Sequence, residues 1–166
     1  MDATPSDDGL GQAELRRILH PGVGSARRIA VVGLSADWNR PSHFAASYMQ
    51  HKGWTVLPVN PRYAGQSILG QPCVARLEDL DAPPDIVDVF RRSEDVEPIA
   101  ASAIALGARC LWQQLGVVNL AAHQAALQAG LASVFNRCVK IEHARLFGGL
   151  HWAGVNTGVI SARRRA

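Results

Sequence analysis

The segment that most constrains the fold is the apolar run Ile29–Val32, which is followed by Gly33. A run of this kind, with no polar residue in alternation, is typical of a strand that is buried on both faces. Such strands belong to parallel sheets, because the crossover connections of a parallel sheet carry helices that cover both of its faces. The run therefore predicts an α/β fold.

Strand and helix patterns alternate along the chain. Three successive helical patterns end in a glycine, which is the residue that most often terminates a helix. The alternation predicts a three-layer Rossmann or flavodoxin-like fold, with an open, mostly parallel five-stranded sheet, helices on both faces and right-handed crossovers. The expected strands are 28–34, 54–59, 85–90, 109–112 and 131–135, the expected helices are 14–20, 44–53, 93–107, 119–130 and 139–146, and a minor strand and a helical turn are expected at 68–70 and 77–80.

Two polar residues are predicted to cap helices. Ser93 and Asn119 each precede an apolar helical pattern, and their side chains can accept hydrogen bonds from the free amide groups of a first helical turn. Glu94, Asp95 and Glu97 follow Ser93 directly. Carboxylates suit that position because the start of a helix carries a partial positive charge.

The length of 166 residues and the hydrophobic content of 48% indicate one soluble globular domain. Residues 1–12 are polar and predict a disordered leader, and residues 13–147 form the expected domain. Residues 148–166 fit two alternatives equally, a flexible tail or an arm that packs on a partner subunit.

Several classes of protein are excluded by what the sequence lacks. No apolar stretch is long enough to cross a bilayer and the N-terminus has no signal-peptide core, so we expect a cytoplasmic protein without membrane contact. Cys73, Cys110 and Cys138 have neither disulfide-framework nor metal-ligand spacing. The net charge of +3 lies partly in Arg163–Arg165, and no basic stripe for nucleic acid is present.

The junction after the first strand is the first candidate for chemistry. Gly33 would let a phosphate approach the backbone, and the following helix start offers free N–H groups to an anion. Arg40 and Ser42 add a guanidinium and a hydroxyl at that helix start. Taken alone, Gly33 also fits a simple tight turn and Arg40 a solvated side chain.

The common nucleotide fingerprints are missing. The chain has no GxGxxG and no P-loop, and its second strand ends in Asn60–Pro61, where NAD-binding proteins carry an acidic residue. These absences favour a phosphate-bearing adenine ligand other than NAD or ATP.

Several stretches, taken in order, resemble a family of small bacterial coenzyme A-binding proteins related to the N-terminal domain of the succinyl-CoA synthetase α subunit. They match over roughly residues 15–147 and comprise AVVGLS (30–35) with RPS (40–42), VLPVNP (56–61), GQSILG (65–70), VDVFR (87–91), LWQQLGV (111–117) and NRC (136–138).

The resemblance implies a flavodoxin-like fold with CoA lying across the strand ends. The residues it assigns to the ligand are Gly33, Leu34, Ser35, Arg40 and Ser42 at the phosphates, Asn60, Pro61 and Arg62 in the nucleotide cleft, Val89, Phe90 and Arg91 beside the adenine or pantetheine, and Trp112, Gln113 and Gln114 at the far edge. Phe90 also fits the core, and Trp112 fits the core better than the cleft.

We expect a protein that binds CoA or acyl-CoA without catalytic residues of its own, acting as a sensor, a carrier or a subunit, and able to form a homo-oligomer. Two alternatives stay open. One is a small CoA- or NAD(P)-dependent enzyme that uses Cys138, His43 and Glu142. The other is a regulatory partner of another protein, for which Trp152 and the basic tail are the candidate contacts.

Overall fold

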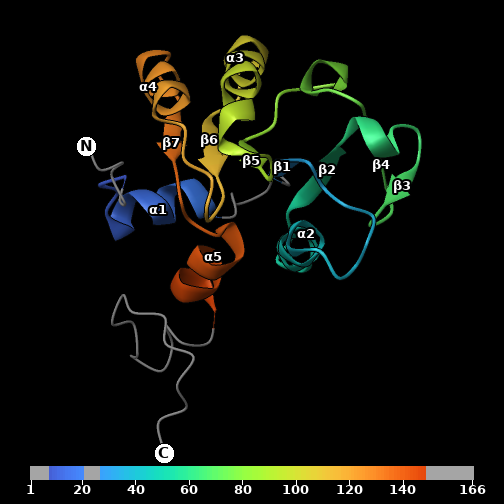
Figure 1. The fold of residues 1–166 in the computed structure, drawn as a ribbon. Coiled ribbons are helices and arrows are strands. Elements are labelled where there is room, and N and C mark those ends of the chain that lie inside the picture. The colour runs from blue at the N-terminus through green and yellow to red at the C-terminus, as the bar shows by residue number, and fades with distance from the viewer. Residues whose placement is uncertain (1–7, 21–26, 149–166) are drawn as a thin grey trace, which may run out of the picture.

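A five-stranded sheet forms the centre of the protein. The structure, a computed structural model, describes residues 8–20 and 27–148. In these ranges all neighbouring strands of the sheet run parallel, in the order β2-β1-β5-β6-β7. The strands are β1 (Arg28–Val32), β2 (Thr55–Val59), β5 (Ile86–Val89), β6 (Cys110–Gln113) and β7 (Ala132–Val134) (Figure 1).

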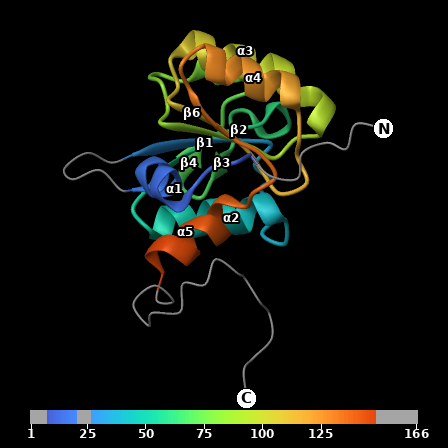
Figure 2. The same cartoon turned by 90° about the vertical axis from the view of Figure 1, so that its left-hand side faces the viewer.

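Helices cover both faces of this sheet, and Figure 2 shows the three layers from the side. One face carries α1 (Gln12–Leu19), α2 (Pro41–His51) and α5 (Val139–Phe147), and the other carries α3 (Val96–Leu106) and α4 (Leu120–Gln128). The predicted three-layer α/β fold is therefore confirmed. No helix in the described ranges is both long and apolar enough to span a bilayer.

The crossover from β2 to β5 is built from short elements. It contains a small antiparallel hairpin and two single turns of 3-10 helix, and the second of these turns packs against α3. A third 3-10 turn precedes α3. These elements are η1 (Pro61–Tyr63), β3 (Ser67–Ile68), β4 (Gln71–Pro72), η2 (Leu77–Asp79) and η3 (Ser93–Asp95).

Strand β1 explains the two-sided core. Ile29 and Val31 pack into the apolar cluster under α1, α2 and α5, whereas Ala30 and Val32 pack into the cluster under α3 and α4. Each is at most 9% exposed. Burial of one such aliphatic side chain contributes about 1.5–3 kcal/mol, so the unbroken apolar run stabilises both layers at once.

One predicted helix cap is confirmed and the other is wrong. The Asn119 side chain accepts the N–H of Ala122 at 2.9 Å and caps α4. Ser93 does not cap α3, because the turn η3 shifts the start of that helix to Val96. The Ser93 hydroxyl instead accepts the N–H of Val118 at 3.0 Å and ties the loop after β5 to the loop after β6.

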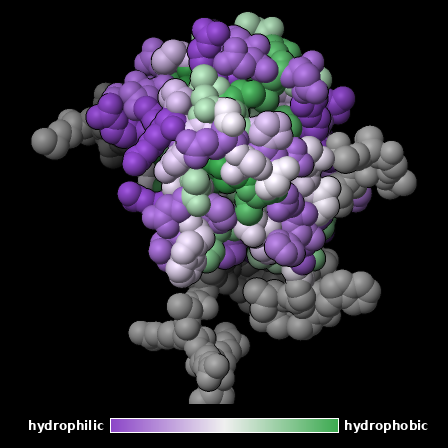
Figure 3. All heavy atoms as spheres, turned by 90° about the vertical axis from the view of Figure 1, so that its right-hand side faces the viewer, coloured by the Kyte–Doolittle hydropathy of each residue, from purple (hydrophilic) through white to green (hydrophobic). Residues whose placement is uncertain are grey.

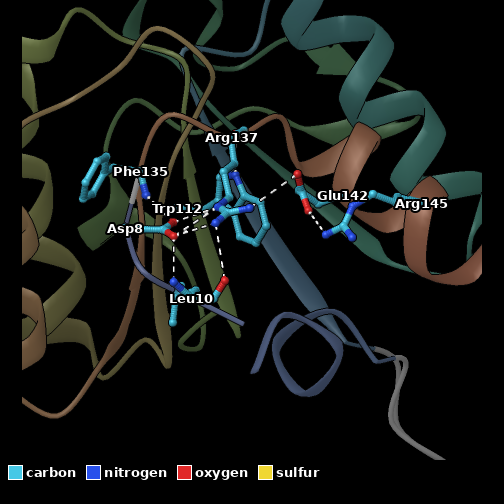
Figure 4. Close-up of polar contacts among 7 residues, drawn as sticks. All are labelled: Asp8, Leu10, Trp112, Phe135, Arg137, Glu142 and Arg145. Atoms are coloured by element: carbon cyan, nitrogen blue, oxygen red, sulfur yellow. Dashed lines mark hydrogen bonds and ion pairs between the residues drawn. The ribbon is translucent and has the colours of Figure 1, made fainter. Parts of the chain in front are cut away.

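Residues 8–12 fall inside the segment predicted as a disordered leader, yet they contact the domain. Helix α1 already begins at Gln12. The Asp8 carboxylate is fully buried and accepts hydrogen bonds from the Arg137 guanidinium at 2.8–3.1 Å and from the N–H of Phe135 at 3.3 Å (Figure 4). Residues 1–7 and the predicted tail beyond Gly148 lie outside the described residues.

Candidate functional site

The strand order places a crevice at the carboxyl ends of β1, β2 and β5. The chain turns from β1 to α2 on one face of the sheet and from β5 to α3 on the other, so the loops diverge between these two strands. Ligands of doubly wound α/β proteins bind at this switch in strand order. A cavity of about 430 Å³ opens there, between the ends of β1 and β2, the turn η2 and the start of α3. We call it the switch-point cavity.

Gly33 forms part of the wall of this cavity. Its φ is +89°, and a Cβ atom at this position would lie 2.5 Å from the carbonyl oxygen of Phe90. Its N–H donates to the carbonyl of Val59 at 2.8 Å. The absence of a side chain therefore lets the ends of β1, β2 and β5 approach one another.

Two serines hold the loop between β1 and α2. The Ser42 hydroxyl is buried and accepts the N–H of Ser35 at 3.0 Å, and the Ser35 hydroxyl accepts the N–H of Asp37 at 3.0 Å. A hydroxyl that accepts a bond still has a hydrogen to donate. Both serines thus shape the loop and keep one donor each.

Asn60 connects this loop to the loop after β2. Its side-chain amide donates to the carbonyl of Leu34 at 3.0 Å, and its side-chain carbonyl accepts the N–H of Arg62 at 3.0 Å. Asn60 is 9% exposed and Leu34 is fully buried. The two loops are joined through this one side chain.

Arg40 and Arg62 supply cationic groups in the loops that follow β1 and β2, outside the lining of the switch-point cavity. Both are exposed, and among the residues that the structure describes neither guanidinium has a carboxylate partner. Arg40 is the N-cap residue of α2, and no side chain caps the start of this helix, where the N–H of Ser42 has no partner among the described residues. Arg62 lies over the ring of Tyr63. Two unpaired positive charges next to an uncapped helix start favour an anion.

The predicted residues at the far edge point into the protein. Trp112 is completely buried, and its indole N–H donates to the carbonyl of Arg137 at 2.8 Å (Figure 4). The Gln113 side-chain amide donates to the carbonyl of Asn119, and its side-chain oxygen accepts the N–H of the same residue. The Gln114 side-chain amide donates to the Asp88 carboxyl group. These three side chains are part of the fold, as is the buried Val89.

The structure therefore brings only some of the predicted residues to one place. Gly33, Pro61 and Arg91 line the switch-point cavity. The neighbouring loops carry Ser35, Arg40, Ser42, Asn60 and Arg62, and the half-buried Phe90 packs against the core cluster under α2.

The other side of the cavity was not foreseen from the sequence. It is formed by η2 and by the first turns of α3, and its polar groups include Arg76, Glu78 and Ser102. The sequence predicted a helical turn at 77–80 and a helix at 93–107, but it did not indicate that these two elements meet. The long crossover between β2 and β5 brings the turn η2 against α3, and no local sequence pattern predicts this contact.

The carboxylates of this wall outnumber its cations. Arg91 lies 3.7 Å from Asp95, and Arg76 pairs at 3.2 Å with Asp79 outside the cavity. The Ser102 hydroxyl donates to Glu78 and holds the pKa of that carboxyl below its usual value. Arg92, outside the cavity, lies 3.2 Å from Asp95 and 3.5 Å from Glu94, so among the described residues Glu78 is the carboxylate of this wall that forms no ion pair with an arginine.

Asp88 is a buried acid that the sequence analysis did not single out. It is 1% exposed, and burial raises its pKa to about 8. The Gln114 amide donates to one of its oxygens at 2.6 Å, and the other has no partner among the described residues. At neutral pH the side chain is mainly protonated. An acidic residue within an apolar strand was the available signal.

The three residues considered for catalysis, Cys138, His43 and Glu142, have separate surroundings. The His43 Nδ1 lies 3.0 Å from the backbone carbonyl oxygen of Ser35. Burial raises the pKa of the Cys138 thiol, which disfavours the thiolate that reacts. Glu142 pairs with Arg145 at 2.6 Å and lies 3.8 Å from Arg137, in the ionic network of Figure 4. In the described part of the chain, no three His, Cys, Asp or Glu side chains could hold a metal ion.

A larger cavity of about 1040 Å³ lies at the opposite edge of the sheet, between α1 and the carboxyl ends of α3 and α4. Arg27 in its wall donates to the carbonyls of Arg17 and His20 at the end of α1. Cations at helix carboxyl ends offset the partial negative charge there. These contacts explain the position of the Arg27 side chain without a bound ligand.

The face that carries β2 and the β3–β4 hairpin is mostly hydrophilic. Figure 3 shows it with a small group of hydrophobic side chains near the centre. Single apolar side chains within a polar surface are common in soluble domains, so the described residues on this face form no extended apolar patch.

The fold and the cavity place the chain in the class of doubly wound α/β proteins. The five strands of the sheet, numbered in chain order, follow the flavodoxin-like order 2-1-3-4-5. Within that class, the profile of the family described as CoA binding domain matches residues 27–144, and the chain belongs to this family.

Three relatives agree with this assignment. YneT of Bacillus subtilis (strain 168), an uncharacterized protein, is 38% identical over 133 residues, which are 80% of this chain and 94% of YneT. Cell-free ID.343 from Thermus thermophilus is 38% identical in sequence, and its structure gives a TM-score of 0.76. The match covers 83% of this chain and 100% of that one. A hypothetical protein from Pyrococcus horikoshii OT3 is 34% identical, and its structure gives a TM-score of 0.78. This match covers 89% of this chain and 100% of that one.

Proposed function

We propose that the protein binds coenzyme A or acyl-CoA, with the nucleotide end at the crevice between β1, β2 and β5. The observation that carries this proposal is the pair of unpaired guanidinium groups, Arg40 and Arg62, beside the uncapped start of α2. Membership of the CoA binding domain family supports CoA as the ligand.

The pyrophosphate fits the side of the crevice formed by the loops after β1 and β2. Arg40 and Arg62 offer guanidinium groups there, which bind phosphate oxygens in pairs. The backbone N–H of Ser42, in the first turn of α2, adds a donor that suits an anion. A phosphate here would meet positive charge that no carboxylate of the described residues already neutralises.

The adenosine fits the switch-point cavity. The cavity volume of about 430 Å³ is in the range of small-molecule sites, about 300–1,000 Å³. Val59, Leu77 and Ile99 give it apolar walls for a flat ring. CoA as a whole is larger than this cavity, so the pantetheine arm would leave it along the strand ends.

The protein is proposed to act as a sensor, carrier or subunit and to perform no chemistry on the acyl group. A nucleophile needs a base within hydrogen-bonding reach and a group that orients that base. Of the three residues considered for such roles, Cys138 has a raised thiol pKa and Glu142 has arginine partners. The third, His43, has its Nδ1 3.0 Å from the backbone carbonyl oxygen of Ser35.

Isothermal titration calorimetry with CoA tests the proposal. We expect saturable binding that weakens about tenfold or more in Arg40→Ala, since a charge-assisted hydrogen bond contributes about 1.5–3 kcal/mol and 1.4 kcal/mol is a factor of ten. Arg109→Ala is the matched control, because Arg109 is similarly exposed but lies at the opposite edge of the sheet. Binding of NAD in the absence of CoA binding would overturn the proposal.

A further inference from the structure

The structure points to a ligand specificity that deepens the proposed function and rests on it. We infer that the site binds the adenosine and pyrophosphate of the ligand but does not select for a phosphate on the ribose. The chemical class it fits is an ADP-containing thiol or thioester with free ribose hydroxyls. Dephospho-CoA belongs to this class, and it should bind at least as tightly as CoA.

The switch-point cavity is lined by the carboxylates of Glu78, Glu94 and Asp95 and by the guanidinium groups of Arg76 and Arg91. Arg92, outside the cavity, lies 3.5 Å from Glu94 and 3.2 Å from Asp95, so among the described residues Glu78 is the carboxylate of this wall without an arginine ion pair. The ribose of an adenosine in this cavity would carry its 3′-phosphate among these groups. A dianionic phosphate is repelled by carboxylates at such short range.

Both cations of the switch-point cavity already have a carboxylate partner. Arg91 lies 3.7 Å from Asp95. Arg76 lies 3.2 Å from Asp79, which also accepts the backbone N–H of Arg76. A ribose phosphate at either guanidinium would also approach the negative charge of that carboxylate, whereas Arg40 has no carboxylate partner among the described residues.

The Ser102 hydroxyl donates a hydrogen bond to Glu78 and holds it in place between η2 and α3. That hydrogen bond also keeps the pKa of Glu78 low, so the group is charged at neutral pH. In dinucleotide-binding folds, an acidic residue accepts from a free ribose hydroxyl and an arginine accommodates a ribose phosphate. Here Glu78, from the crossover, supplies the acidic group that the end of β2 lacks.

Calorimetry on the full chain with CoA, dephospho-CoA and ADP tests this inference. The expected result is that CoA binds no more tightly than dephospho-CoA. In Glu78→Gln, the affinity for CoA should rise several-fold relative to dephospho-CoA. Glutamine removes the charge but can still accept the bond from Ser102. Glu97→Gln on α3 is the control, since Glu97 is exposed and does not line the cavity, and it should leave the ratio unchanged.

Tighter binding of CoA than of dephospho-CoA would overturn the inference and leave the proposed function standing. Loss of that preference in Arg76→Ala would then identify Arg76 as the phosphate ligand. Binding of neither CoA nor dephospho-CoA would overturn the proposed function and this inference together.

Discussion

Gly33 holds the most constrained backbone position of the site. Its positive φ already disfavours other residues, and the Phe90 carbonyl occupies the place of a side chain. Gly53 has a similar φ of +91°, yet no atom lies within 4 Å of its Cβ position. The two glycines therefore separate the effect of backbone conformation from the effect of a steric clash.

We expect Gly33→Ala to lower the free energy of unfolding by about 2–4 kcal/mol, because the strain of a positive φ, of order 1–3 kcal/mol, is joined by a clash with backbone. Gly53→Ala should cost about 1 kcal/mol. Urea unfolding of both variants measures the difference. Equal losses would show that the loops after β1 and β5 can separate without penalty.

Asp88 gives a pH dependence whose sign follows from its raised pKa. An aspartate in the unfolded chain titrates near 3.9, and burial raises the pKa of Asp88 to about 8 in the folded state. Between these values the folded protein holds a proton that the unfolded chain has lost. The contribution of Asp88 to stability is thus complete at acidic pH and is lost as the pH rises toward 8.

Asp88→Asn removes this contribution and keeps an acceptor for Gln114. We expect the variant to become more stable relative to the wild type as the pH rises from 5 to 8, by up to about 1.4 kcal/mol per pH unit. Urea unfolding at four pH values measures the difference, in which all other titrating groups cancel. Parallel curves for the two proteins would contradict the prediction.

Among the elements, the start of α4 is fixed by one side chain. Asn119 accepts the N–H of Ala122 and donates to the carbonyl of Ser93 at 2.9 Å, so it caps the helix and joins two loops. Asn119→Ala should cost about 1–2 kcal/mol of stability, measured by thermal unfolding. Gln124→Ala, at an exposed position of the same helix, should change it by less than about 0.5 kcal/mol. A similar change in both variants would show that the cap contributes little.

The elements also show why the sequence predicted the sheet better than the site. The strands were predictable because apolar runs buried on both faces carry a local signal, as in Ile29–Val32. Ser93 was misassigned because a 3-10 turn and an α-helix begin with the same residues. Glu78 and Ser102 meet only through tertiary packing of the crossover on α3, and nothing local in either segment encodes that contact.

At the scale of the whole molecule, ligand binding should appear as stabilisation of the folded state. A ligand at 100 times its Kd adds about 2.7 kcal/mol, which corresponds to roughly 5–10 °C in Tm for a chain of this size. We expect CoA to produce such a shift in the wild type. The double variant of Arg40→Ala and Arg62→Ala should show none at the same concentration. An equal shift in the double variant, measured by differential scanning fluorimetry, would place the ligand elsewhere.

The Asn60 side chain links the loop after β1 to the loop after β2 before any ligand arrives. Folding itself therefore sets the spacing between the two segments that carry Arg40 and Arg62. A rigid receptor of this kind loses little conformational freedom on binding. Short ligands that reach both loops, such as ADP, should thus retain much of the affinity of the full-length cofactor, while the flexible arm beyond the phosphates adds comparatively little.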